Sequence, residues 1–179
     1  MSRVELVGPD QAPLLARAYY PDEGQASPIV RALAQVPELL EVAMPFIARV
    51  FGPTSVDLRT KEIVVLRVSA INGCRYCVDA HTVAAWDAGL TQAETAALRG
   101  PVAGFSTAEE ALVAFCDAFC NTPAPVPEDV MRCFRTHFAE HAIVELSLLA
   151  GATAMLNRFC TALELPTTPA TRVRLEAAM

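Results

Sequence analysis

The chain has 179 residues, with 14 Lys and Arg against 20 Asp and Glu, and therefore a formal net charge of −6 at pH 7. This acidic balance argues against a nucleic-acid partner, because binding to a phosphate backbone requires a basic face. Hydrophobic residues make up 53% of the chain, yet no uncharged apolar run reaches the about 18 residues that a membrane span requires, so no membrane partner is expected.

Helix signals run through the whole chain, whereas strand signals are weak. Short β-branched clusters such as Ile63-Val64-Val65-Leu66 sit inside longer segments with helical periodicity. In chain order, the expected helices cover residues 28–35, 38–51, 58–71, 74–88, 92 onward, 107–121, 127–138, 140–164 and 169 onward. The helix at 140–164 is apolar around most of its circumference, and we expect it to be central. The predicted class is all-α, an orthogonal or bundle-like packing of about seven to nine helices.

Capping residues mark several of the expected helix starts. Ser27 before Pro28 reads as an N-cap followed by proline at the first helical position. Asp57 is expected to cap the helix that follows it. Thr107 and Glu110 fit a capping box, in which each side chain bonds the backbone N–H of the other residue.

The length suits one domain with its own core, and no Gly-, Ser- or Pro-rich linker divides the chain, so we expect one domain over residues 1–179. The start of the chain has no apolar core of a secretion signal. Six cysteines without such a signal indicate a reducing, cytoplasmic location, where a Cys-x-x-Cys motif is catalytic or metal-binding rather than a structural disulfide. The mean hydropathy of +0.34 is high for a chain without a membrane span, and it points to contacts between subunits of a homo-oligomer.

The stretch with the clearest chemistry is Cys74-Arg75-Tyr76-Cys77, followed four residues later by His81. Asn72-Gly73 reads as the end of one helix, with glycine in the left-handed cap, and a second helix starts at or near Cys74. At about 100° per residue, Cys77 lies about 60° from Cys74, and His81 lies about 40° from Cys77. All three side chains therefore project from one face. Both cysteines fall in the first turn, where unpaired N–H groups and the helix dipole favour a thiolate.

Glu62 is predicted to join this site. It lies about ten residues before the Asn72-Gly73 turn and His81 lies about eight after it, so at about 1.5 Å rise per residue they are about 15 and 13 Å from the turn. If the two helices fold back as an antiparallel hairpin, Glu62 and His81 come level. A carboxylate, an imidazole and two thiols can then form a proton relay that ends on a sulfur nucleophile.

This pattern of Glu, eleven residues, Cys-x-x-Cys, three residues and His resembles the alkylhydroperoxidase D-like group of the carboxymuconolactone decarboxylase family. The resemblance covers about residues 30–165, which we take as the core of the domain, and Gly89-Leu90-Thr91 after the helix is also typical. The best-known members carry a histidine between the two cysteines, where this chain has Tyr76.

The resemblance implies a thiol-dependent peroxidase of the alkylhydroperoxide reductase type. A hydroperoxide would oxidise Cys77 to a sulfenic acid, Cys74 would condense with it to a disulfide, and His81 with Glu62 would relay protons. An external dithiol would reduce the disulfide, and in well-known relatives this reductant is a lipoyl-bearing protein. No flavin or haem motif occurs, so no cofactor and no metal are expected. Relatives form dimers, trimers and hexamers, which agrees with the expected homo-oligomer.

Other functions stay open at this point. The activity that names the family is a decarboxylation of a ring-opened lactone, but those decarboxylases generally lack the Cys-x-x-Cys motif. A non-catalytic zinc or dithiol module could use Cys74, Cys77 and His81, although a structural zinc site requires a fourth ligand that the sequence does not supply nearby. The stretch from His137 to His141 matches the H-x-x-E-H pattern of some zinc peptidases, which requires one continuous helix, and here the helical pattern breaks after Phe138.

The remaining four cysteines are expected to be core residues. Cys116 and Cys120 lie four apart on one helix face, which is a poor geometry for a disulfide. Cys133 and Cys160 are read in the same way, as small buried hydrophobes. Redox shuttling by one of the four stays open.

Overall fold

The computed structural model describes residues 2–121 and 125–178. These residues form nine α-helices and two short 3-10 helices, and no strand occurs among them, which confirms the predicted all-α class. The two 3-10 helices are η1 (Pro9–Gln11) and η2 (Leu14–Tyr19). The α-helices are α1 (Pro28–Leu33), α2 (Pro37–Phe51), α3 (Leu58–Ile71), α4 (Arg75–Asp87), α5 (Gln92–Ala97), α6 (Thr107–Asn121), α7 (Glu128–His137), α8 (Glu140–Ala162) and α9 (Pro169–Ala177).

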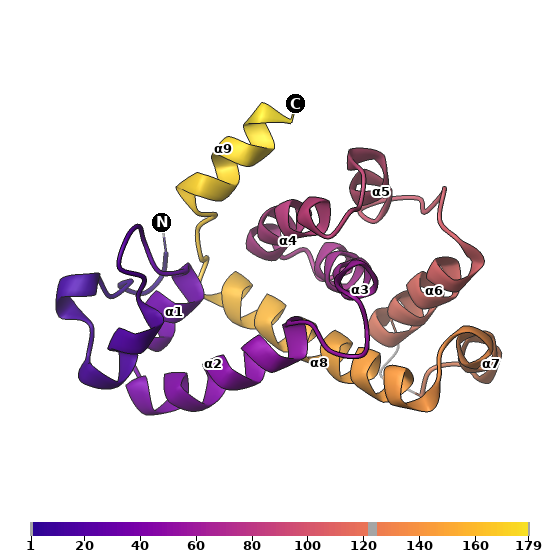
Figure 1. The fold of residues 1–179 in the computed structure, drawn as a ribbon, viewed down its shortest axis with the longest axis horizontal. Coiled ribbons are helices and arrows are strands. Elements are labelled where there is room, and N and C mark those ends of the chain that lie inside the picture. The colour runs from indigo at the N-terminus through magenta and orange to yellow at the C-terminus, as the bar shows by residue number, and fades with distance from the viewer. Residues whose placement is uncertain (1, 122–124, 179) are drawn as a thin grey trace.

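Helix α3 is the buried centre of the fold, with α4, α6 and α8 packed around it (Figure 1). Every residue from Lys61 to Leu66 is buried, and so are Val68 and Ser69. The main hydrophobic core forms around this helix. Because α3 has no wide face towards water, its polar residues require partners inside the protein.

Helix α8 packs against α2, α3, α4 and α7, as its predicted central place requires, but one of its faces is open. Val144, Leu148 and Met155 are 69%, 51% and 53% exposed. The apolar circumference therefore divides into an inner face on α3 and an outer face on the protein surface.

By length and composition α8 is also the one described helix that could cross a membrane. Core helices of soluble proteins share this property, and the packing of the inner face assigns α8 to the core.

Lys61 ties the end of α2 to α3 and α8. Its ammonium group lies 2.7 Å from the carboxylate of Glu145 and donates to the carbonyl oxygens of Val50, at 3.0 Å, and Gly52, at 2.7 Å. The side chain is 1% exposed, so these oxygens replace the water that a buried cation loses. The same bonds anchor the last turn of α2, and with it Phe51.

The turn between α3 and α4 has the predicted glycine cap. Gly73 has a φ of +66°, a left-handed conformation that glycine adopts without the steric cost of a Cβ atom. The N–H of Gly73 donates to the carbonyl of Ala70, and the N–H of Cys74 donates to that of Ser69. This pair of bonds is a Schellman motif. It reverses the chain and places Cys74 against the buried α3.

The predicted capping box at the start of α6 is shifted by one residue. The Ser106 hydroxyl accepts the N–H of Glu109 at 3.3 Å, and the Glu109 carboxylate accepts the N–H of Ser106 at 2.9 Å. The box is therefore Ser106 with Glu109, not Thr107 with Glu110. Both registers fit the sequence pattern, and Arg59, which pairs with Glu109 at 2.9 Å, stabilises the earlier one. Of the loop expected before α7, residues 122–124 lie outside the described residues.

Candidate active site

The N-terminus of α4 carries the predicted cysteine pair. Cys74 is the N-cap residue, and its Sγ accepts the backbone N–H of Cys77 at 3.4 Å. The two residues are joined as a disulfide with their Cα atoms 5.3 Å apart, and their exposed fractions are 1% and 6%. The predicted helix start is confirmed. The two sulfurs are also as close as a dithiol–disulfide cycle requires.

Glu62 and His81 come level, as the hairpin geometry predicted. Oε2 of Glu62 on α3 lies 2.9 Å from Nδ1 of His81 on α4. The Glu62 side chain is 10% exposed and that of His81 is 26% exposed. The ring centroid of Phe51 lies 5.8 Å from that of His81. A carboxylate and an aromatic ring from two other helices therefore hold the imidazole in place.

A small cavity of about 70 Å³ lies beside Cys77 and His81. Cys74 does not line it. Its polar lining includes Ser69 and Asn157, which are fully buried and bonded to each other at 3.0 Å. Its remaining lining residues are Ile29, Phe51, Val65, Tyr76, Ala80, Thr153 and Leu156. The cavity therefore offers Cys77 a small, mostly apolar space with an imidazole in its lining.

The sequence reading missed Asn157 and Ser69. Asn157 accepts a hydrogen bond from the side-chain amide of Asn72 at 3.0 Å, in addition to its bond with Ser69. These bonds connect the cavity to the α3–α4 turn. The only signal in the sequence is that a serine and an asparagine interrupt apolar stretches of α3 and α8.

Cys74 faces a different space from Cys77. A pocket of about 250 Å³ is lined by Cys74 and Cys160, together with the segment of the chain that follows α8. Tyr76 lines both this pocket and the cavity of Cys77. Burial raises the pKa of Tyr76 well above its usual value, so the phenol stays neutral between the two spaces. Each of the two cysteines of the disulfide therefore lines a different space, Cys74 the pocket and Cys77 the cavity.

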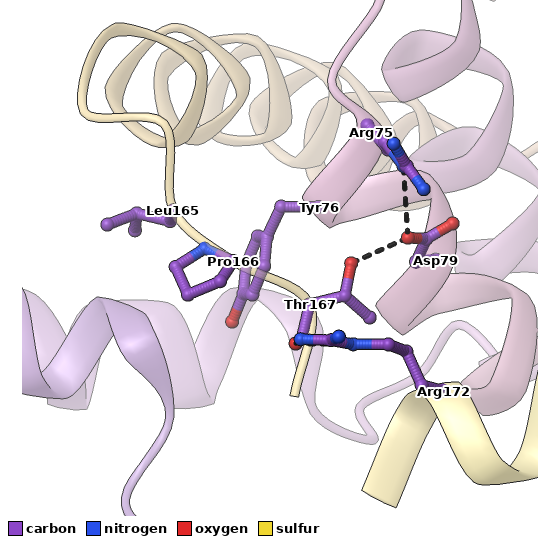
Figure 2. Close-up of a pocket in the computed structure, with 7 residues that line it drawn as sticks. All are labelled: Arg75, Tyr76, Asp79, Leu165, Pro166, Thr167 and Arg172. Carbon is purple, nitrogen blue, oxygen red and sulfur yellow. Dashed lines mark hydrogen bonds and ion pairs between the residues drawn. The ribbon is translucent and has the colours of Figure 1, made fainter. Parts of the chain in front are cut away.

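Next to this pocket lies a third space of about 310 Å³, between α4 and the start of α9 (Figure 2). Arg75 and Asp79 project into it from α4, and Arg172 enters it from α9. The Thr167 hydroxyl donates to Asp79 at 2.6 Å. This polar space shares Arg75, Tyr76 and Leu165 with the pocket of Cys74.

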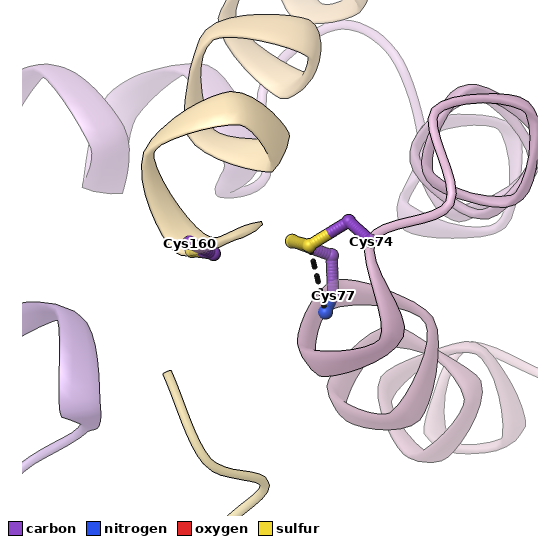
Figure 3. Close-up of side chains that lie close together, drawn as sticks. All are labelled: Cys74, Cys77 and Cys160. Carbon is purple, nitrogen blue, oxygen red and sulfur yellow. Dashed lines mark hydrogen bonds between the residues drawn. A yellow bond between two sulfur atoms is a disulfide. The ribbon is translucent and has the colours of Figure 1, made fainter. Parts of the chain in front are cut away.

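Cys160 of α8 is buried, as the sequence predicted, and it also lies at the site. Its Sγ and those of Cys74 and Cys77 all lie within 4.8 Å of one another (Figure 3). Burial raises the pKa of the Cys160 thiol to about 12, so it is a neutral thiol at physiological pH. Three clustered sulfurs are also a donor set that suits thiophilic metal ions. No local spacing reveals this neighbour, because α8 brings it from the far end of the chain.

The other sequence candidates lie away from this site. His137 ends α7 and His141 lies in the first turn of α8, so the continuous helix that the H-x-x-E-H pattern requires is absent. Cys116 is buried and Cys120 is partly buried, and both are free thiols. Cys133 is exposed, so its reading as a core residue is wrong. It lies on an amphipathic helix, α7, whose apolar face is turned the other way.

Comparison with known proteins gives a family match. Residues 37–117 match the model of the carboxymuconolactone decarboxylase family. The matched segment runs from α2 into α6 and contains Glu62, Cys74, Cys77 and His81, whereas Cys160 lies outside it.

Solved structures share the fold. A protein of unknown function from Agrobacterium tumefaciens, described as a candidate antioxidant defence protein AhpD, is 25% identical, with a TM-score of 0.70 over 76% of this chain and 95% of that chain. A peroxidase-related protein with an alkylhydroperoxidase AhpD core, from Ralstonia eutropha JMP134, is 17% identical, with a TM-score of 0.85 over 95% and 94% of the two chains. The debrominase Bmp8, as a cysteine-to-alanine variant in complex with 2,3,4-tribromopyrrole, is 19% identical, with a TM-score of 0.79 over both whole chains.

Proposed function

The chain belongs to the carboxymuconolactone decarboxylase family, and we propose that within it the chain is a thiol-dependent peroxidase that reduces hydroperoxides with its Cys74–Cys77 pair. One observation carries the proposal. Cys77 lines a small cavity together with His81, which is bonded to Glu62, and its sulfur is within bonding reach of Cys74. This arrangement provides a nucleophile, a proton carrier and a resolving thiol in one place.

The first step takes place in the cavity. The Cys77 thiolate attacks the outer oxygen of the peroxide, the O–O bond breaks, and the leaving oxygen takes a proton from His81. Cys77 is oxidised to a sulfenic acid and the peroxide is reduced to an alcohol or water. Because Nδ1 of His81 is bonded to the Glu62 carboxylate, Nε2 is the nitrogen that exchanges the proton.

The second step closes the disulfide. Cys74 attacks the sulfenic sulfur of Cys77, the S–S bond forms, and hydroxide leaves with the thiol proton as water. An external dithiol then attacks the disulfide and restores both thiols. We propose that it enters through the pocket of about 250 Å³ at Cys74. A lipoyl-type dithiol, which is slender and flexible, suits that pocket.

The size of the cavity supports a small substrate. Its volume is about 70 Å³, enough for a few small molecules of the size of water. Hydrogen peroxide, or the reacting end of a small alkyl hydroperoxide, fits such a space. The debrominase shares only the fold with this chain, at 19% identity, so dehalogenation is a second candidate. In that reaction the carbon–bromine bond would break, bromide would leave, the carbon would take a proton, and the two thiols would be oxidised to the Cys74–Cys77 disulfide.

The decisive experiment measures peroxide consumption with dihydrolipoamide as the reductant. We expect Cys77→Ser to lose more than about a hundredfold of the activity, since the nucleophile that makes the first bond is gone. Cys133→Ser, at an exposed position outside the site, is the matched control and should retain full activity. A Cys77→Ser protein that still turns over peroxide would contradict the proposal. Metal analysis of the reduced protein tests the zinc alternative in the same preparation.

We also propose that the working form is a homo-oligomer in the cytoplasm. An apolar groove of about 480 Å³ lies between α2 and α8, and its most exposed side chains are Leu39, Val42 and Met155, at 60%, 72% and 53%. The groove has almost no polar lining, which favours a second copy of the chain as its occupant over a charged partner. A reducing cytoplasm would return the site to its dithiol form.

A further inference from the structure

We propose that Cys160 is a second resolving cysteine, which condenses with oxidised Cys77 when Cys74 is not available. The inference rests on the proposed function, because it requires a peroxide to convert Cys77 to a sulfenic acid. It adds a third sulfur, from a different helix, to the reaction.

The position of Cys160 carries this inference. Its Sγ lies within 4.8 Å of those of both Cys74 and Cys77. All three belong to one buried cluster with Ala32 and Leu165. A disulfide requires a sulfur separation of about 2.05 Å, so the sulfurs of Cys77 and Cys160 must approach by less than about 3 Å. Rotation of two short side chains supplies much of this movement.

The neighbourhood of Cys160 has room for that rotation. The residue lies in the last turn of α8, which ends at Ala162, and it lines the same pocket as Cys74. The other free thiols of the described residues, Cys116, Cys120 and Cys133, do not belong to this sulfur cluster. Of these four free cysteines, Cys160 is therefore the one that lies beside the redox pair.

The reaction balances without a further oxidant. The sulfenic acid of Cys77 reacts with the Cys160 thiol, the S–S bond forms between them, and the sulfenic oxygen leaves as water with the thiol proton. Peroxide has supplied the two oxidising equivalents in the previous step. The new disulfide exposes its Cys160 sulfur to the pocket that already serves Cys74, so the same external dithiol can reduce it.

The positions of Cys74 and Cys160 determine which of them reacts first with oxidised Cys77. Cys74 is three residues from Cys77 and caps the same helix, so it reacts first whenever it is free. Cys160 acts when Cys74 is held in a mixed disulfide with the reductant. A second peroxide would otherwise convert an unresolved Cys77 to a sulfinic acid, which thiols do not reduce. The third sulfur thus protects the nucleophile during turnover.

The test uses the reduced full-length Cys74→Ser variant, treated with one equivalent of hydrogen peroxide. Serine is a preferred N-cap residue, so α4 keeps its cap. We expect peptide mass mapping to find a Cys77–Cys160 disulfide. A neighbouring thiol in the same protein competes with dimedone for the sulfenic acid, so dimedone trapping of Cys77 should fall by at least about tenfold relative to Cys74→Ser/Cys160→Ala. Cys74→Ser/Cys116→Ala is the matched control, with a buried thiol removed elsewhere, and should behave like the single variant.

The outcomes separate this inference from the proposed function. If dimedone traps Cys77 equally in the single and double variants and Cys160 remains a free thiol, Cys77 is oxidised but Cys160 does not resolve it, and the inference is wrong. If Cys77 is oxidised in none of the variants, the proposed function itself fails. The variant Cys74→Ser/Cys160→Ser repeats the comparison with a second side chain at position 160, and it separates loss of the thiol from an effect of alanine on the end of α8.

Discussion

Glu62 and His81 meet across the α3–α4 pair, with Oε2 of the carboxylate 2.9 Å from Nδ1 of the imidazole, and His81 lines the same cavity as Cys77. Glu62 itself is not part of the lining of that cavity, so we expect it to act on Cys77 through the imidazole. This chain of contacts makes the two thiols of the pair chemically unequal. Cys77 has the imidazole beside it, whereas Cys74 shares its pocket with Tyr76 and Cys160.

The first prediction concerns this inequality. In the single Cys74→Ser and Cys77→Ser variants, iodoacetamide should label Cys77 faster than Cys74 between pH 6 and 7, because an imidazolium stabilises the adjacent thiolate. His81→Ala should slow the labelling of Cys77 by about tenfold, or about 1.4 kcal/mol, and leave Cys74 less changed. Glu62→Gln should have a smaller effect in the same direction.

Exposed His141, on α8 and away from the pair, provides the control substitution to alanine, which should change neither rate. The assigned roles of the two cysteines would be wrong if Cys74 were labelled faster than Cys77, or if His81→Ala left the labelling rate of Cys77 unchanged.

The second prediction concerns the oxidised product of the wild-type protein. Mild peroxide should produce the Cys74–Cys77 disulfide and leave Cys116 and Cys120 as thiols, since neither belongs to the cluster of sulfurs at the site and two cysteines four apart on one helix face are poorly placed for a disulfide. Non-reducing peptide mass mapping after one equivalent of peroxide provides the measurement. A Cys116–Cys120 crosslink with Cys74 still free would rule it out.

The third prediction concerns assembly through the groove between α2 and α8. Light scattering of the wild-type protein should give at least twice the 19.2 kDa of one chain. Val42→Glu should shift the particle towards one chain, because it places a charge in a desolvated apolar contact. Val173→Glu on α9, at a position 64% exposed and outside the groove, should leave the mass unchanged. A wild-type particle of one chain at all working concentrations would refute the assembly.

The fourth prediction concerns acid stability. The hydrogen bond from Arg59 lowers the pKa of Glu94 to about 2, against about 4.3 for an unperturbed glutamate. A group with a depressed folded pKa stabilises the fold above its unfolded pKa, and this contribution is lost as the pH falls through the folded value. We therefore expect the free energy of unfolding in urea to fall from about pH 4.5 towards pH 2. Glu94→Gln should lower stability at pH 7 and flatten the dependence in that window, unlike Glu38→Gln at an exposed position of α2. Equal slopes in wild type and Glu94→Gln would contradict this assignment.

The sequence predicted what local geometry determines and missed what depends on docking between distant segments. The glycine cap, the helix start at Cys74 and the fixed rise per residue suffice to bring Glu62 level with His81. Cys160 reaches the site only through the packing of α8 against α3 and α4, and no spacing in the sequence records that packing. The apolar circumference of α8 is similarly ambiguous, because a face for a second chain and a face for the core have the same composition.

The last prediction tests whether the cavity sets the substrate size. Val65 lines the cavity, whereas Val64, next to it on α3, is equally buried but does not. Val65→Ala should enlarge the space beside Cys77, and the ratio of kcat/KM for cumene hydroperoxide to that for hydrogen peroxide should rise by about tenfold, the scale that one or two methyl groups in an apolar pocket produce. Val64→Ala should lose similar stability, about 1 to 3 kcal/mol, because it removes the same atoms from the core. Its substrate ratio should stay at the wild-type value.

If the two variants change the ratio equally, the effect arises from a loosened core and the cavity does not select the substrate. If neither changes it, the peroxide approaches Cys77 by another route, and the proposal that the substrate binds between Cys77 and His81 must be abandoned.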